Sequence, residues 1–138
     1  MKKDNPLKDK SYAFAVRIVK MYKYLCDKKH EYVLSKQVLR SGTSIGANIV
    51  EVNGAISKDD FSAKMSIAYK EALETKYWLD LLKDSGYLES KGYDELYQEA
   101  DEISRMLFAV LKSTGRVRSI SKDQCSISAR CILIIVNC

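Results

Sequence analysis

The sequence has 138 residues, of which 46% are hydrophobic and 30% charged, and its formal net charge is +5. That length suits one domain with its own core, and the composition excludes a disordered chain. The two longest apolar runs, residues 106–111 and 131–136, are far too short to cross a bilayer. No signal peptide is visible after Met1, so we expect a cytoplasmic protein without membrane contact.

The first predicted helix spans residues 9–29. Its apolar residues recur at the i, i+4, i+7, i+11 spacing of one helix face: Phe14, Ile18, Met21 and Leu25. Pro6 and Asp9 lie where such a helix would begin. His30 follows the last turn, where a solvated helix-end histidine is far commoner than a catalyst.

The second predicted helix spans residues 36–54, with Ser35 as its N-cap. A heptad seam runs through Val38, Gly42, Ile45, Ile49, Val52 and Ile56. Residues 41–47 are mostly small and could form a loop, but the unbroken apolar period favours a helix. A helical glycine costs about 1 kcal/mol relative to alanine. We therefore expect Gly42 and Gly46 to lie at a close helix–helix contact, where leucine would be too large.

The third predicted helix spans residues 58–85. Ser57 followed by Asp60 resembles a capping box, and Gly86 suits the position just after a helix. The seam of this helix comprises Phe61, Met65, Ala68, Ala72, Thr75, Leu79 and Leu82. We assign helix packing to Gly42, Gly46, Ile45, Ile49, Ala68 and Ala72.

Glu71 and Glu74 lie beside this seam, between apolar neighbours. Paired carboxylates can bind a metal or act as a base, but a di-iron bundle needs Glu-x-x-His pairs on two helices. The sequence has one histidine, and its four cysteines show no CxxC spacing, so we expect no metal and no cofactor. We expect the carboxylates to pair with Lys or Arg, or to accept hydrogen bonds from hydroxyls and Asn48 of the second helix.

The fourth predicted helix spans residues 90–113, with a seam of Tyr93, Leu96, Ala100, Ile103, Leu107 and Val110. Short connections favour antiparallel neighbours, and no strand pattern alternates with the helices. The predicted fold is therefore all-α, an antiparallel up-down four-helix bundle over residues 7–113.

Residues 114–138 form a tail without helical period, in which residues 132–136 are apolar and mostly β-branched. We predict that this tail is non-helical and poorly ordered. A sheet partner, an RNA-contacting arm and a non-native extension are the alternatives for it.

Two stretches of the chain resemble the family of 23S ribosomal RNA intervening-sequence proteins. They are residues 37–51 (QVLRSGTSIGANIVE) and, after Asp60-Phe61, residues 67–79 (IAYKEALETKYWL). The resemblance covers about residues 7–113. It implies a four-helix bundle without known catalysis, assembled as a homopentamer. A related branch is the accessory protein of diversity-generating retroelements, a basic pentameric ring credited with holding nucleic acid and a reverse transcriptase.

Basic residues are concentrated in the first half of the chain. Residues 1–64 hold 13 Lys or Arg against 7 Asp or Glu, whereas residues 65–113 hold 6 against 10. A basic surface favours phosphate contacts, which give affinity without reading sequence. The candidate nucleic-acid-binding residues are Lys20, Lys23, Lys28, Lys29, Lys36 and Arg40. The alternatives are a solvated helix face and attraction between oppositely charged helices or subunits.

The sequence thus predicts a non-enzymatic interaction protein that binds structured RNA or a nucleoprotein partner. The alternative is a structural scaffold that binds no nucleic acid. The sequence shows no set of nucleophile, base and orienting residue and no phosphate-binding loop, so we expect no catalytic residue and no small-molecule substrate.

Further apolar and aromatic residues lie outside the four seams: Tyr12, Val19, Tyr69, Trp78, Tyr97 and Phe108. One bundle interior has no room for all of them, so we expect a homo-oligomer in which a closed ring buries the excess. Five subunits are implied only by the family resemblance.

Overall fold

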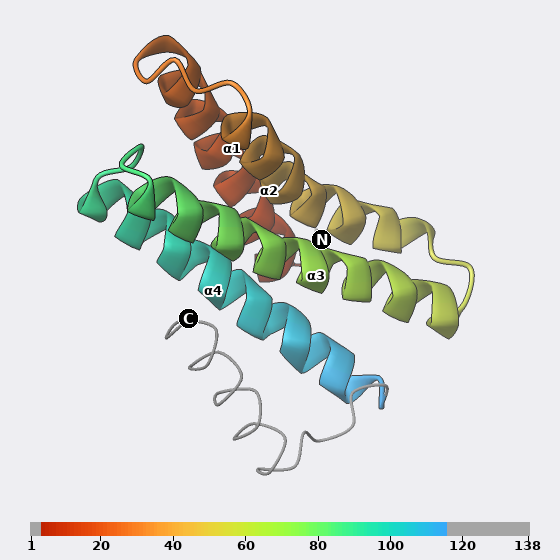
Figure 1. The fold of residues 1–138 in the computed structure, drawn as a ribbon. Helices are drawn as coiled ribbons and strands as arrows, with labels where there is room; N and C mark the ends of the chain where they lie inside the picture. The colour runs from red at the N-terminus through yellow and green to blue at the C-terminus, as the bar shows by residue number, and fades with distance from the viewer. Residues whose placement is uncertain (1–3, 116–138) are drawn as a thin grey trace, which may run out of the picture.

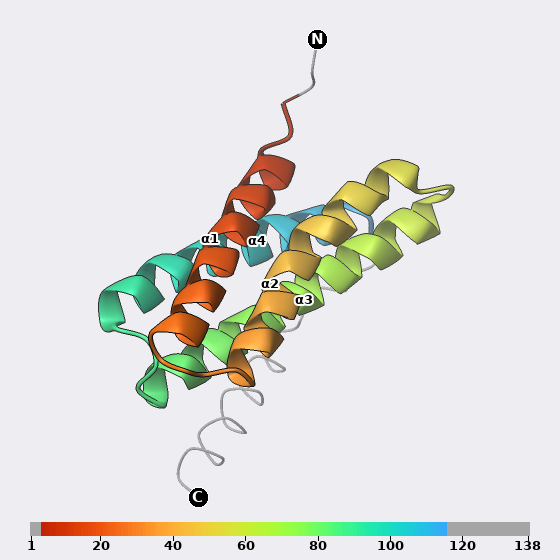
Figure 2. The same cartoon turned by 90° about the horizontal axis from the view of Figure 1, so that it is seen from above.

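The computed structural model describes residues 4–115, and these residues form four α-helices and one short 3-10 helix. The elements in chain order are α1 (Pro6–Asp27), α2 (Leu34–Glu51), η1 (Val52–Gly54), α3 (Lys58–Asp84) and α4 (Ser90–Ser113). Figure 1 shows α2, α3 and α4 side by side with alternating direction, and Figure 2 shows α1 beside α2. The prediction of an all-α antiparallel bundle is confirmed. Residues 116–138, most of the predicted tail, lie outside the described residues.

The core consists of the predicted seams with few changes. Its buried side chains include Phe14, Ile18, Leu25, Val38, Ile45, Ile49, Met65, Ala68, Ala72, Leu79, Leu82, Ile103 and Leu107. The prediction for Ile56 is wrong, because this side chain is 93% exposed. The reason is that α2 ends at Glu51 and η1 turns the chain, so the heptad does not continue. Near the end of α4, Leu111 is buried while Val110 is partly exposed.

The first helix begins three residues earlier than predicted, because Asn5 caps it. The Asn5 side-chain oxygen accepts a hydrogen bond from the Lys8 backbone N–H at 3.1 Å. Pro6 occupies the first turn, where its missing N–H costs nothing. The helix ends at Asp27, and His30 adopts a φ of 51° in the turn that leads to α2.

A glutamate, and not the predicted serine, caps the start of α2. Glu31 is buried, and its Oε1 accepts hydrogen bonds from the backbone N–H groups of Val33 at 3.0 Å and Leu34 at 2.8 Å. Its Oε2 accepts another from Ser35 at 2.6 Å. The Ser35 hydroxyl instead donates back to the Glu31 carbonyl at 2.8 Å, so the Ser35 prediction is wrong.

The predicted boundaries of α3 carry the expected capping contacts. Ser57 Oγ accepts from the Asp60 backbone N–H at 3.0 Å, and Asp60 Oδ2 accepts from the Ile56 N–H at 3.3 Å. The reciprocal bond thus reaches one residue further back than in the usual capping box. At the other end, Gly86 has a φ of +84°, which glycine adopts without strain.

The small-residue stretch 41–47 is helical, and its two glycines face α1. A Cβ added at Gly42 would lie 2.9 Å from both Cγ atoms of Ile18, which is closer than carbon atoms can approach. A Cβ at Gly46 would lie 3.5 Å from the backbone oxygen and Oγ of Ser11, an ordinary van der Waals distance. The close contact is therefore confined to Gly42, and its neighbour is the side chain of α1.

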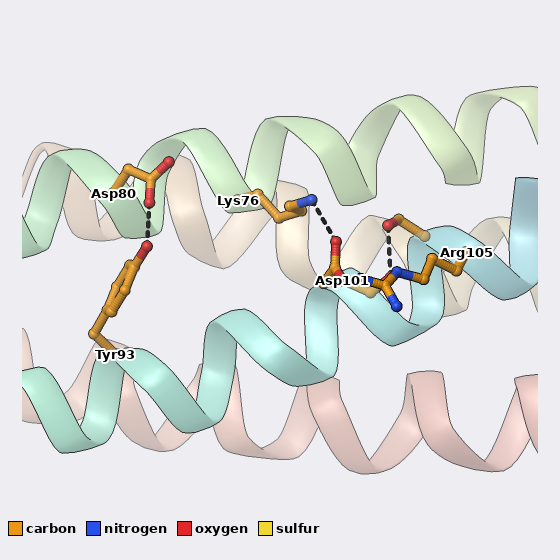
Figure 3. A network of polar contacts seen from close by, with 6 residues as sticks. Lys76, Asp80, Tyr93, Asp101 and Arg105 are labelled. Carbon is orange, nitrogen blue, oxygen red and sulfur yellow. Dashed lines mark hydrogen bonds and ion pairs between the residues drawn. The ribbon is translucent and has the colours of Figure 1, made fainter.

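Polar contacts join α3 to α4 along one side of the bundle (Figure 3). Asp101 pairs with Lys76 at 2.7 Å and with Arg105 at 2.7 Å, and only 19% of the Lys76 side chain is exposed. The two cations beside it lower the pKa of Asp101, the Lys76 hydrogen bond being the larger cause. Further along the same interface, the Tyr93 hydroxyl donates a hydrogen bond to Asp80.

The glycine geometry predicts unequal effects of alanine at the two positions. Gly42→Ala should lower the free energy of unfolding by about 1–3 kcal/mol, because Ile18 must move to admit the methyl group. Gly46→Ala should be neutral or stabilising by up to about 1 kcal/mol, since the methyl group fits and alanine is the better helix former. Urea unfolding of both variants beside the wild type measures the difference. The reverse order would contradict the close contact at Gly42.

The Glu31 cap predicts a pH-dependent contribution to stability. Burial alone would raise the pKa of Glu31, but the hydrogen bonds from Leu34, Ser35 and Val33 outweigh it and lower the pKa. The charged form is therefore the stabilising one, so its contribution is complete above the unfolded pKa of about 4.3. It is lost as the pH falls through the lower pKa of the folded state.

Glu31→Ala should accordingly cost about 1–2 kcal/mol at pH 7 and much less near pH 3. Urea unfolding at both pH values measures this. Glu89→Ala is the matched control, because Glu89 precedes α4 at the N-cap without any side-chain capping hydrogen bond. An equal loss in both variants, or a loss independent of pH, would contradict the assigned cap.

Candidate nucleic-acid interface

The hairpin of α1 and α2 brings the six predicted cations to one end of the bundle. Lys20 and Lys23 belong to the last turns of α1, Lys28 is its C-cap, and Lys29 lies in the following turn. Lys36 and Arg40 belong to the first two turns of α2. All six are exposed. The Glu31 hydrogen bonds fix the turn between the helices and so set the spacing of the cations on either side.

None of these six residues forms an ion pair within residues 4–115. The cations that do form ion pairs are elsewhere: Lys10 with Glu102, Arg17 with Glu95 and Glu99, Lys64 with Glu51, and Lys76 and Arg105 with Asp101. Within the described residues, no ion pair thus involves a cation of the hairpin end. We call Lys20, Lys23, Lys28, Lys29, Lys36 and Arg40 the hairpin cations.

Aromatic side chains lie among the hairpin cations, and the sequence pattern did not single them out. Tyr24 directly follows Lys23 and is 40% exposed. Tyr32 lies three residues after Lys29 and is 53% exposed. Tyr32 lies with its hydroxyl 3.2 Å from Nδ1 of His30. Aromatic residues interleaved with lysines were visible in the sequence, but only their exposure distinguishes them from core residues.

A cleft of about 700 Å³ opens beside the hairpin cations, between the second half of α1 and the start of α4. Its lining is Arg17, Lys20, Met21, Tyr24, Leu88, Glu89, Gly92 and Leu96. This site joins residues about 70 positions apart, so no local sequence pattern could reveal it. Lys20 is the one hairpin cation that lines it.

The predicted polar residues between α2 and α3 have different partners from those expected. Asn48 donates to the backbone oxygen of Ser44 at 2.8 Å, and Glu74 accepts from the indole N–H of Trp78 at 3.1 Å. Glu71 Oε2 is buried and has no hydrogen-bond partner among the residues that the structure describes. Burial and the neighbouring Glu74 raise the pKa of Glu71, and the charge of Arg40 opposes them. Within residues 4–115, Glu71 accepts no hydrogen bond from the α2 hydroxyls or Asn48, so that alternative is wrong, whereas the charge of Arg40 on α2 acts on Glu71 as the other alternative, pairing with Lys or Arg, expected.

The hydroxyls of this interface bond to each other and to the backbone instead. Thr75 Oγ1 lies 3.0 Å from Ser41 Oγ and donates to the Glu71 carbonyl at 2.8 Å. Among residues 4–115, no group of three His, Cys, Asp or Glu side chains is arranged to hold a metal ion. None of the four described α-helices is both long and apolar enough to span a membrane.

The chain is similar to proteins named after ribosomal RNA. The family model described as 23S rRNA-intervening sequence protein matches residues 3–109. A crystal structure at 1.70 Å of a protein of unknown function from the S23 ribosomal protein family of Bacteroides thetaiotaomicron VPI-5482 has 50% sequence identity. The match covers 77% of this chain and 98% of that chain, with a TM-score of 0.76. No curated protein is significantly similar to the chain. This chain therefore belongs to the 23S rRNA-intervening sequence protein family.

Proposed function

We propose that this protein is a non-enzymatic, oligomeric interaction protein that binds structured RNA through the hairpin cations. The observation that carries the proposal is the gathering of six cations at one end of the bundle, all of them exposed and without an ion pair within residues 4–115. Unpaired surface cations are the groups that exchange small counterions for phosphates.

An assembly of several copies would make this binding effective. Each hairpin end offers too few cations for tight binding alone, but linked copies act together on one RNA. Phosphate contacts fix position and do not read bases, so the binding we propose tolerates many sequences. The family name, which refers to an insertion in 23S rRNA, agrees with an RNA ligand.

Exposed apolar residues on α1 and α2 support self-association. A groove of about 670 Å³ between these helices is lined by Tyr12, Ala15, Ala47 and Val50, among others, and Tyr12 is 73% exposed. Some of the predicted excess is used inside the bundle, however. Tyr69 packs on Phe108 with ring centroids 5.9 Å apart, and Tyr97 packs on Tyr93 at 5.3 Å. The apolar surface left for another copy is therefore smaller than the sequence predicted.

This apolar groove also favours a second candidate function, a protein scaffold that binds no nucleic acid. In that case the hairpin cations would be an ordinary solvated surface, and the groove would be the functional one. The two candidates differ in one measurable respect, which is whether RNA binds in a salt-dependent manner.

We predict that wild-type protein binds a labelled structured RNA and loses roughly a thousandfold in affinity between about 50 and 200 mM salt. Changing Lys20, Lys23, Lys28 and Lys29 together to Ala should lower the affinity and flatten the salt slope, because fewer counterions are released. Fluorescence anisotropy titrations measure the affinity, and circular dichroism at each salt concentration checks that the helices remain.

The control removes positive charge elsewhere. Lys58, Lys70 and Lys112 are exposed and form no ion pair within residues 4–115, and they lie away from both the hairpin end and the apolar groove. Their joint replacement by Ala should change the salt slope much less. An absence of binding at 50 mM salt, or equal effects of both sets, would remove the RNA proposal and leave the scaffold.

We also predict that the protein is a homo-oligomer in solution. Light scattering at tens of micromolar should give a mass that is a multiple of 15.7 kDa. Val50→Asp should reduce this mass, because a carboxylate in the apolar groove would have to be desolvated on association. Val50 is half exposed, so its replacement leaves the bundle core intact. A wild-type mass of one chain would contradict the prediction.

A further inference from the structure

The interface between α1 and α4 is joined by ion pairs over part of its length and is open beyond them. Its contacts include exposed ion pairs, Lys10 with Glu102 and Arg17 with Glu95 and Glu99. Beyond Arg17 the two helices leave the 700 Å³ cleft between them. The floor is apolar, because Met21 and Leu96 are buried core residues. Figure 2 shows the end of α1 and the start of α4 at the same end of the bundle.

Gly92 lines this cleft at a position where neither the backbone conformation nor a close contact requires glycine. It lies in the first turn of α4, and it is not among the glycines with positive φ. A Cβ built on Gly92 would meet no atom of residues 4–115 within 4 Å. Alanine would therefore fit and would favour the helix by about 1 kcal/mol. The missing side chain leaves open space in the wall of the cleft.

We propose that this cleft binds one unpaired nucleotide of an RNA, with its base against Tyr24 and its phosphate on Lys20. This inference rests on the proposed RNA function and adds the kind of RNA, namely one with bases that are not paired. A base has two apolar faces, which suit the Tyr24 ring and the floor of Met21 and Leu96. Stacking on an aromatic side chain is the usual means of holding an unpaired base.

The charges of the cleft fit a nucleotide in one orientation. Lys20 is unpaired within the described residues and is free to bind a phosphate, whereas Arg17 is occupied by Glu95 and Glu99. Glu89 would repel a phosphate, so the phosphate belongs at the α1 side of the cleft. On the α4 side, the carboxylate of Glu89 can accept hydrogen bonds from the amino groups of a base. The phosphates that follow would continue towards Lys23, one turn along α1.

A filled cleft gives the sharpest test, because it removes the space that the nucleotide would occupy. Gly92→Phe places a ring in the cleft, starting from a Cβ that meets no atom of the described residues within 4 Å. Its control is Gly54→Phe, since a Cβ at Gly54 also meets nothing within 4 Å and this glycine is in η1. The probes are a labelled 12-nucleotide single-stranded RNA of mixed sequence and a fully paired RNA duplex of equal length. Gly92→Phe should weaken single-strand binding about tenfold or more, and Gly54→Phe should not.

A second variant tests the stacking itself. Tyr24→Leu keeps apolar volume but removes the aromatic face, so it should weaken single-strand binding about tenfold while the salt slope stays unchanged. Tyr77→Leu is the control, because Tyr77 is a more exposed tyrosine on α3. Duplex binding should change little in all four variants. Circular dichroism confirms that each variant is folded.

The outcomes separate this inference from the proposed function. Wild-type protein that binds neither RNA would remove both. Wild-type protein that binds with steep salt dependence, while Gly92→Phe and Tyr24→Leu bind the single strand as the wild type does, would overturn the nucleotide cleft alone. A change of oligomeric mass in Gly92→Phe would also overturn it, because the cleft would then hold a second copy of the chain.

Discussion

The contact of Gly42 with Ile18 is the constraint on which the rest of the structure depends. Because position 42 carries no side chain, Ile18 fits against the α2 backbone, and α1 and α2 can run close together. That approach makes the hairpin, and the hairpin places cations from two helices at one end of the molecule. The Glu31 carboxylate then closes the same end by satisfying the first N–H groups of α2. Packing and capping together therefore set the geometry of the basic surface.

The three successive helix pairs bury apolar seams. In addition, α2 and α3 share the ion pair of Lys64 and Glu51, and α3 and α4 share the partly buried pair of Lys76 and Asp101. Between α1 and α4, carboxylates and cations with exposed side chains contribute little free energy, about 0–1 kcal/mol each. The weaker pair is also the one that leaves a cleft, so the least tightly packed side of the bundle is the side open to a ligand.

Most of the fold could be predicted because its signals are local. A seam such as Phe14, Ile18 and Leu25 repeats within one helix, and Ser57 with Asp60 marks a helix start within four residues. The Glu31 cap could not be predicted, since it depends on the path of the turn and not on a residue type favoured before helices. The sequence also could not distinguish Gly42 from Gly46, because the residue that each glycine contacts lies on another helix, α1.

The candidate site was only half predictable for the same reason. The hairpin cations lie on adjacent segments, so their grouping follows from one predicted hairpin. Tyr24, Glu89 and Gly92 meet only through the angle at which α4 passes α1, and no pattern in the sequence encodes that angle. Glu71 Oε2, which has no hydrogen-bond partner among the described residues, could not be predicted either, because its surroundings come from two helices.

The order of the helices in space also bears on how the chain folds. Each successive pair closes over a short connection, so three hairpins can form from near neighbours with little loss of loop entropy. The α1–α4 interface joins residues as far apart as Lys10 and Glu102, so closing it costs more loop entropy. Its exposed ion pairs stabilise it by only about 0–1 kcal/mol each. Such an interface is expected to form last and to open first by local unfolding. The cleft would then lie at the interface that opens most easily, and a ligand bound there would stabilise the closed bundle.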